Sequence, residues 1–248
     1  MRTLLLVIFC LLWYVSSSFA QFQAHRKLIK RKNSGKDAYF GIRAGGGYSD
    51  WYGELVAYSD TDNRYRPLLV GSAGIVGGFN FHRYFGVSAE VNYLMHRIEY
   101  QSASESDLLK MRTQRQFVEV PILFYLTMFQ PDRRIRPYFY GGPSFSYMLD
   151  ATQSMVHYDL ATAQPKGARI ASDVSGLHET LNYGVLSGVG VKFAISRVVA
   201  LKVDVRHYLG LSRVYKEKEL QTRDYMLSGN IGLVFTNLTN FEKQRYFQ

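Results

Sequence analysis

The chain has 248 residues, 47% of them hydrophobic and 20% charged, with 30 Lys+Arg against 20 Asp+Glu. This balance excludes a disordered chain, and 21 Gly with 6 Pro excludes a collagen-like or proline-rich one. A single cysteine excludes a disulfide scaffold, a zinc ribbon and an iron–sulfur protein.

Residues 1–20 have the features of a cleaved signal peptide. Arg2 supplies a positive start, and small residues at positions 18 and 20 suit a signal peptidase. The apolar run from Leu4 to Val15 is too short and wrongly flanked for a membrane span. Cleavage would remove the only cysteine and lower the formal charge by the one unit of Arg2, from +10 to +9. We therefore expect an exported protein that is stable without disulfides.

A basic leader follows at residues 21–37, and a polar tail ends the chain at residues 236–248. The cations of the leader are Arg26, Lys27, Lys30, Arg31, Lys32 and Lys36. We expect a flexible, solvated segment on the periplasmic side. A docking segment for an acidic surface or partner is the alternative.

Between residues 38 and 235, apolar and polar side chains alternate, which is typical of β-strands. The alternation predicts eight strands, at residues 39–48, 68–81, 85–99, 114–128, 137–149, 181–195, 198–209 and 224–235. These segments run to about 10–15 residues, whereas soluble strands average about 5–6. A tilted strand of this length can cross a bilayer.

The connections between these segments alternate between short and long. Three are tight, near residues 82–83, 129–135 and 196–197, and four are long, at residues 49–67, 101–113, 150–180 and 210–223. This alternation predicts an up-and-down meander with short turns at one end and long loops at the other. In outer-membrane barrels the short turns face the periplasm and the long loops face outward.

One face of each predicted strand is almost purely apolar and carries aromatic residues near the strand ends. These aromatics would form two girdles at the membrane interfaces: Phe40, Tyr48, Tyr93, Phe124, Phe139, Tyr147, Tyr183, Phe193, Tyr225 and Phe235. The predicted fold is therefore all-β, an eight-stranded antiparallel up-and-down transmembrane β-barrel over residues 38–235 in the cell outer membrane. A soluble lipocalin-like barrel with the apolar face inside is the alternative. Pro121 lies mid-strand, so we expect a bulge beside it, and we expect the last strand to end at Phe235.

The other face of the strands carries charges that would point into the barrel lumen. They are Arg43, Glu90, Arg115, Glu119, Lys192, Lys202, Asp204 and Arg206. An eight-stranded barrel is just wide enough for side chains to fill, and charges at bilayer depth need partners. We expect a structural network that plugs the barrel, with a narrow selective pore as the alternative.

Chemistry beyond this network finds little support in the sequence. His96, His157, His178 and His207 are candidates for the outer rim, where some small barrels place a catalytic histidine, but no nucleophile motif accompanies them. We expect no enzymatic activity, no cofactor or metal site and no nucleic-acid partner. The longest loop, at residues 150–180, is the candidate for contact with a surface partner.

Several short motifs occur in a characteristic order: QFVEVPIL at 116–123, RPY at 136–138, GGPS at 141–144, GVGV at 188–191 and DVRHYLGL at 204–211. Together they resemble the PorT-like outer-membrane β-barrel family. The resemblance implies a closed outer-membrane barrel that acts by scaffolding or surface recognition, and it places Glu119 and Arg206 in the family motifs. The founding member serves type IX protein secretion, so an accessory role there is the first alternative, and a lipid-modifying enzyme is the second. Expected partners are outer-membrane lipid and envelope or secretion-system proteins. The sequence leaves the oligomeric state open.

Overall fold

The computed structural model describes residues 37–53, 63–82, 84–103, 107–128, 134–159, 162, 164–196, 198–217 and 221–236. The chain divides into two compact units, Met1–Ser34 and Gly35–Gln248, and every described residue belongs to the second. The predicted signal peptide, residues 21–36 of the leader and residues 237–248 of the tail lie outside the described residues. In the described part of the chain, no helix is both long and apolar enough to span a bilayer.

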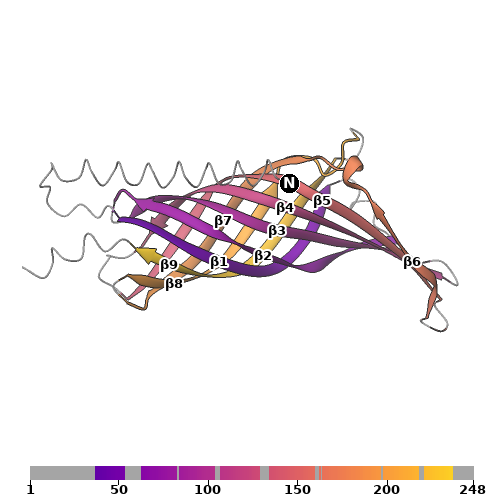
Figure 1. Ribbon diagram of the computed structural model, residues 1–248, viewed down its shortest axis with the longest axis horizontal. Helices are drawn as coiled ribbons and strands as arrows, with labels where there is room; N and C mark the ends of the chain where they lie inside the picture. Colours follow the sequence, from indigo (N-terminus) through magenta and orange to yellow (C-terminus); the bar gives the residue numbers. More distant parts are fainter. Residues whose placement is uncertain are drawn as a thin grey trace, which may run out of the picture. The chain divides into compact units, whose positions relative to one another are not determined.

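Eight antiparallel strands close into a ring (Figure 1). They are β1 (Asp37–Gly53), β2 (Asn63–Asn80), β3 (Phe85–Ala103), β4 (Asp107–Thr127), β5 (Ile135–Asp159), β7 (Leu181–Ala194), β8 (Val199–Gly210) and β9 (Thr222–Thr236). Neighbours in the ring are consecutive in the chain, apart from the inserted β6, and β1 closes the ring on β9 from Tyr39↔Thr236 to Gly53↔Thr222. The predicted up-and-down barrel of eight strands is confirmed.

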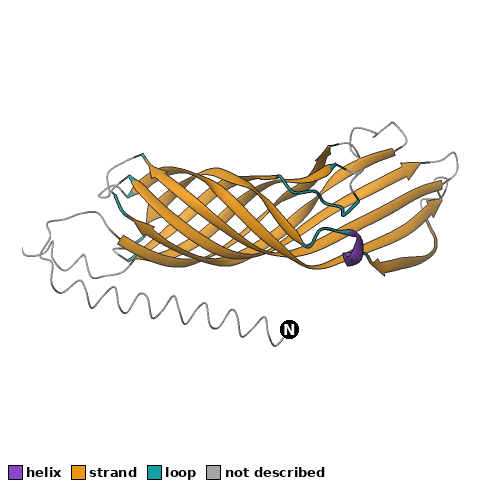
Figure 2. Cartoon of the chain, turned by 90° about the horizontal axis from the view of Figure 1, so that it is seen from above, coloured by secondary structure: helices purple, strands orange, loops and turns teal. Residues whose placement is uncertain are grey.

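Two of the predicted long loops are mostly strand, so that prediction was wrong. β3 and β4 continue through most of the supposed loop at 101–113, and β5 runs for 25 residues to Asp159. An additional strand, β6 (Pro165–Asp173), folds back onto β5, and a short 3-10 helix, η2 (Ser175–Leu177), follows it. Figure 2 shows these strands reaching beyond the ring at one end. Beyond the ring the outward face turns from apolar to polar, as at Arg97, Glu99 and Arg112, so the alternation of apolar-out and polar-in residues fades there although the backbone pairing continues.

The outer wall of the ring is apolar and is bounded by two aromatic girdles. Phenylalanines lie at the short-turn end, and we call them the inner girdle: Phe40, Phe85, Phe124, Phe139, Phe193 and Phe235. Tyrosines lie toward the opposite end, and we call them the outer girdle: Tyr48, Tyr93, Tyr147, Tyr183 and Tyr225. The inner and outer residues are eight positions apart on β1, β3 and β5 and ten apart on β7 and β9. At about 3.3 Å per residue and about 40° of tilt, this spacing gives an apolar band of about 20–25 Å.

Pro121 interrupts one ladder of the barrel without a bulge. The β3–β4 register is the same on both sides of it, at Ala89↔Ile122 and at Asn92↔Glu119. The β4–β5 register shift lies instead between Gln116 and Phe117. The expected bulge beside Pro121 was therefore wrong: the strand loses local pairing there and keeps its register.

Candidate functional site

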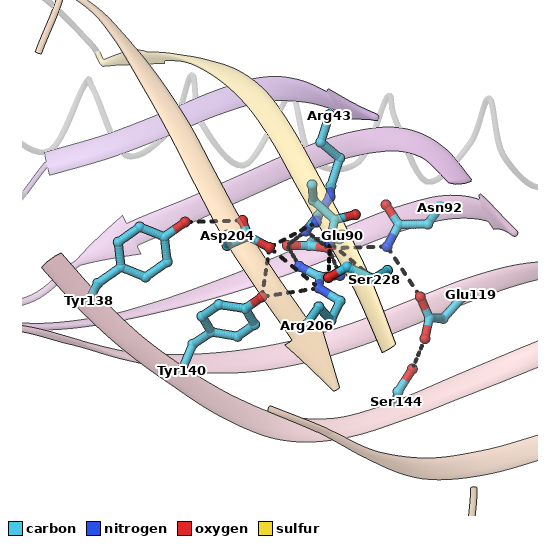
Figure 3. A network of polar contacts seen from close by, with 11 residues as sticks. Arg43, Glu90, Asn92, Glu119, Tyr138, Tyr140, Ser144, Asp204, Arg206 and Ser228 are labelled. Carbon is cyan, nitrogen blue, oxygen red and sulfur yellow. Dashed lines mark hydrogen bonds and ion pairs between the residues drawn. The ribbon is translucent and has the colours of Figure 1, made fainter. Parts of the chain in front are cut away.

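Two arginines and two carboxylates meet at the centre of the lumen (Figure 3). Glu90 on β3 accepts hydrogen bonds from Arg43 Nη1 on β1, at 2.9 and 2.8 Å, and from Arg206 on β8, at 2.8 and 3.1 Å. Asp204 lies 3.4 Å from Arg43 Nη2 and 3.9 Å from Arg206 Nε. We call these four residues the central ion cluster. It joins β3 and β8, which lie on opposite sides of the ring, and β1, which lies midway between them.

Neutral donors complete the shell around the acidic groups. Tyr138 and Tyr140 donate to Asp204, at 3.1 and 2.8 Å. Asn92 donates to Glu90 at 3.1 Å and to Glu119 at 3.3 Å, and Ser144 donates to Glu119 at 2.7 Å. Glu119 therefore joins the central ion cluster through an amide and not through a cation. Burying a carboxylate without hydrogen-bond donors destabilises the folded protein, so these neutral donors stabilise the packed lumen.

Glycines on β7 make room for the two tyrosines. Tyr138 is paired with Gly190 and Tyr140 with Gly188. A Cβ at either glycine would collide with the phenol ring of its partner. The tyrosine rings therefore lie flat across the neighbouring strand, with their hydroxyls directed at the central ion cluster.

The two predicted lumen lysines lie on the short-turn side of the central ion cluster, among aromatic rings, and Lys202 shares one small pocket with Arg43, Glu90 and Asp204. Lys202 Nζ is 4.3 Å from the ring centroid of Tyr125, 4.8 Å from that of Tyr138 and 5.6 Å from that of Tyr39. Lys192 Nζ is 5.5 Å from the Tyr39 ring. Cation–π attraction thus holds the two ammonium groups in this part of the lumen.

Arg115, the remaining predicted lumen residue, belongs to a second charged centre nearer the long-loop end. It forms a close ion pair with Asp224, and its guanidinium carbon lies 5.6 Å from the Trp51 ring and 5.3 Å from the Phe117 ring. Asp224 was not among the predicted network residues, although its place on the polar face of the last strand was the available signal.

An outer cap lies against this second centre. It comprises Trp51, Tyr65, Ile98, His178, Val214 and Tyr215. Tyr215 stacks on His178 at 4.7 Å and meets Trp51 edge-on at 5.6 Å, and His178 Nδ1 is 3.3 Å from the carbonyl of Val214. Burial, helped by the nearby positive Arg115, lowers the pKa of His178 to about 4. The ring is therefore neutral at ordinary pH, as a buried cap requires.

The four histidines do not form the rim site that a barrel enzyme would need. His96 lies inside the lumen, where Ser49 Oγ is 2.8 Å and Asp224 is 4.0 Å from its Nδ1 atom. A catalytic triad uses the two different ring nitrogens for serine and aspartate, whereas both groups here meet the same one. His157 lies on β5 and not in a loop, and the His207 ring packs edge-on against Tyr225 at 5.1 Å. Among the described residues, no group of three His, Cys, Asp or Glu side chains is placed to hold a metal ion.

Comparison with known proteins agrees with this architecture. The sequence profile of the family described as outer membrane protein beta-barrel domain matches residues 19–216. No curated protein matches the chain. The crystal structure of the outer membrane protein OprG from Pseudomonas aeruginosa superposes with a TM-score of 0.51 at 9% identity, over 83% of this chain and 97% of that one. The Neisserial surface protein A, at 14% identity, covers 78% of this chain and 95% of its own with a TM-score of 0.38. The likeness to these structures concerns the fold alone. The match over most of the chain, together with the closed ring and its apolar band, shows that this protein belongs to the outer membrane protein β-barrel family and resides in the outer membrane.

Proposed function

We propose that the protein is a sealed, non-enzymatic membrane anchor that displays a recognition surface outside the cell. Its lumen is crossed by the central ion cluster, whose side chains are nearly inaccessible to solvent: 8% for Arg43, 7% for Asp204 and 4% for Arg206. The outer cap adds a second layer above it. An interior of this kind supports anchoring better than conduction.

The observation that carries the recognition role is an apolar row on the sheet that extends beyond the outer girdle. The row crosses five neighbouring strands on the face that continues the barrel interior, in the paired order Tyr65, Tyr100, Met111, Met155 and Ile170. All nine residues of β6 are exposed, and Ile170 is 61% exposed. The other four side chains are half-buried, and Tyr65 also packs against the outer cap. An apolar row that stays accessible to solvent and ends in an exposed strand is typical of protein-binding surfaces.

The sealed interior is tested by single-channel recording in planar bilayers. We expect no conductance steps from the wild-type protein. A double variant that empties the cluster, Arg43→Ala with Glu90→Ala, serves as the comparison that opens the lumen. Reproducible steps from the wild-type protein would overturn the anchoring role.

The recognition role is tested by shortening the extended sheet. Thr152 and Asp173 are paired on β5 and β6, so an Asn-Gly turn can replace residues 153–172 without moving the barrel. Cells displaying this variant or Ile170→Asp should lose cell–cell aggregation or adhesion to immobilised matrix protein. Cells displaying Arg134→Gln, at the opposite end of the barrel, should behave as wild type. Unchanged adhesion after shortening would refute the role, provided that gel mobility shows a folded barrel.

A narrower role in type IX secretion rests on the sequence motifs alone, and neither the family match nor the structural neighbours support it. The secreted-protein profile of a deletion strain tests it directly. Loss of a whole class of exported proteins would favour the secretion role, and an unchanged profile would remove it.

A further inference from the structure

The opposite face of the extended sheet carries a basic surface directly above the outer girdle. Arg97 lies four residues beyond Tyr93 on β3, and strand alternation places both side chains on the outward face. Tyr93 donates to Gln116 at 2.8 Å, and Arg97 donates to Gln114 at 2.8 Å. Outward-facing glutamines of β4 thus hold both the girdle tyrosine and the cation above it in place.

Further cations gather around Arg97 across four strands. Arg66 is paired with Glu99, and Glu99 is paired with Arg112, which donates to it at 2.9 Å. Lys110 lies two residues beyond Arg112, and Arg169 on β6 donates to Ser154, the β5 partner of Arg112, at 2.8 Å. We call Arg66, Arg97, Lys110, Arg112 and Arg169 the outward basic face.

The acidic groups near this face are few and lie mostly at its border. Glu99 is the one carboxylate within it among the described residues, and Asp50, Asp150 and Asp173 border it on β1, β5 and β6. Half of the Arg112 side chain stays exposed, at 48%, although it bonds to Glu99. The face therefore keeps an excess of positive charge toward its surroundings.

The height of the face above the membrane selects the anion. At about 3.3 Å per residue and about 40° of tilt, Arg97 lies about 10 Å above Tyr93, and the row at Glu99 lies about 15 Å above it. A phospholipid headgroup layer is only about 5–7 Å thick. Cations at this height on the lipid side of the wall fit a taller headgroup, in which phosphates are carried by sugars.

We propose that the outward basic face binds the phosphates of a phosphorylated glycolipid in the outer leaflet. Arg97 and Arg112 bind the phosphate groups of lipids in the surrounding leaflet. Arg66, Lys110 and Arg169 add further positive charge around them. Guanidinium groups suit this task because they bind phosphate oxygens in pairs. The interaction goes beyond the proposed recognition of a partner, which uses the other face of the sheet.

The test compares diphosphorylated lipid A with its dephosphorylated form as probes. Binding to purified, folded protein in detergent micelles is titrated, and the retained lipid is counted by native mass spectrometry. We expect the triple variant Arg66→Gln, Arg97→Gln, Arg112→Gln to weaken binding of the diphosphorylated probe at least tenfold. The dephosphorylated probe should bind wild type and variant equally weakly.

A charge-matched control separates a site from net charge. Arg134→Gln, Lys166→Gln, Arg213→Gln removes the same number of cations from exposed positions outside the outward basic face and should stay within about twofold of wild type. If the first triple variant does not fold, Arg97→Gln and Arg112→Gln are tested singly, with a three- to fivefold loss expected for each. Equal binding of both probes, or an equal loss in the control, would overturn the proposal. The proposal would also be overturned if soluble inositol hexaphosphate competed with an affinity equal to that of the diphosphorylated lipid, because the face would then be a general polyanion site.

Discussion

Replacing Glu90 by glutamine tests how far the barrel depends on its central ion cluster. The Glu90 carboxylate accepts four hydrogen bonds from two guanidinium groups, at 2.8–3.1 Å, and only 1% of its side chain is exposed. Glutamine keeps the shape and removes the charge. Arg43 and Arg206 would then share Asp204, which is 3.4 and 3.9 Å away. Removing one partner of a buried ion pair costs about 3–5 kcal/mol.

The free energy of unfolding should fall by about 4 kcal/mol in the Glu90→Gln variant. With a urea dependence of about 2 kcal/mol/M, the unfolding midpoint would move down by about 2 M. The measurement is urea titration in lipid vesicles, followed by tryptophan fluorescence and by the mobility shift of folded barrels on unheated gels. Glu217→Gln, on the exposed segment after the cap, is the matched control and should stay within about 0.5 kcal/mol of wild type.

A second variant tests whether the loss of stability comes from the unbalanced buried charge. Glu90→Gln combined with Arg43→Met removes one charge of each sign, and it should recover about half of the loss. A Glu90→Gln variant within about 1 kcal/mol of wild type would refute the reasoning, since the two arginines would then not need this carboxylate.

Three further outcomes follow from the described geometry. Gly190→Ala would drive a methyl group into the Tyr138 ring and should lower the free energy of unfolding by about 1–3 kcal/mol in the same urea titration. Gly77→Ala is the control and should be neutral, because no heavy atom lies within 4 Å of its new Cβ. Trp51→Ala should cost about 3 kcal/mol and speed hydrogen exchange at residues 211–217, because Trp51 is 5% exposed and supports both Tyr215 and Arg115; unchanged exchange there would contradict the cap. The pKa of His178 is lowered from 6.5 to about 4 by burial, so the unfolded segment takes up a proton before the folded one does. Protection of residues 174–180 against hydrogen exchange should thus be constant above about pH 7, decline between about pH 6.5 and 4 and level off below, and His178→Phe should abolish this decline of protection.

The sequence predicts which face of a strand a residue occupies far better than which residues meet. Alternation correctly assigns Arg43 and Glu90 to the inside and Phe40 to the outside, because a barrel wall in lipid tolerates no other pattern. It does not show that Arg43 and Glu90 meet, since they lie on β1 and β3 and are joined across the lumen, with β2 between their strands. Such contacts depend on strand tilt and stagger, which come from the whole ring.

Arg115 illustrates the same limit from the other side. It is lumen-facing like Arg206, yet it pairs with Asp224 near the outer cap and takes no part in the central ion cluster. The sequence pattern does not predict the extension of β3, β4 and β5, for a different reason. Above the apolar band neither face contacts lipid acyl chains, so the alternation that marks a membrane strand is no longer required of the sequence.

The edge of the extended sheet narrows how it can bind a partner. An exposed edge strand normally invites another strand to pair with it, and proteins block this with proline, lysine and bulges. β6 has all three. It begins with Pro165 and Lys166, and the β5–β6 register shift between Met155 and His157 marks a bulge, near which Gly167 adopts a positive φ of 90°. Lys166 is also held by Asp107 at 2.5 Å. A sheet that is blocked at its β6 edge is better suited to bind a partner through its faces, which is where the apolar row and the outward basic face lie.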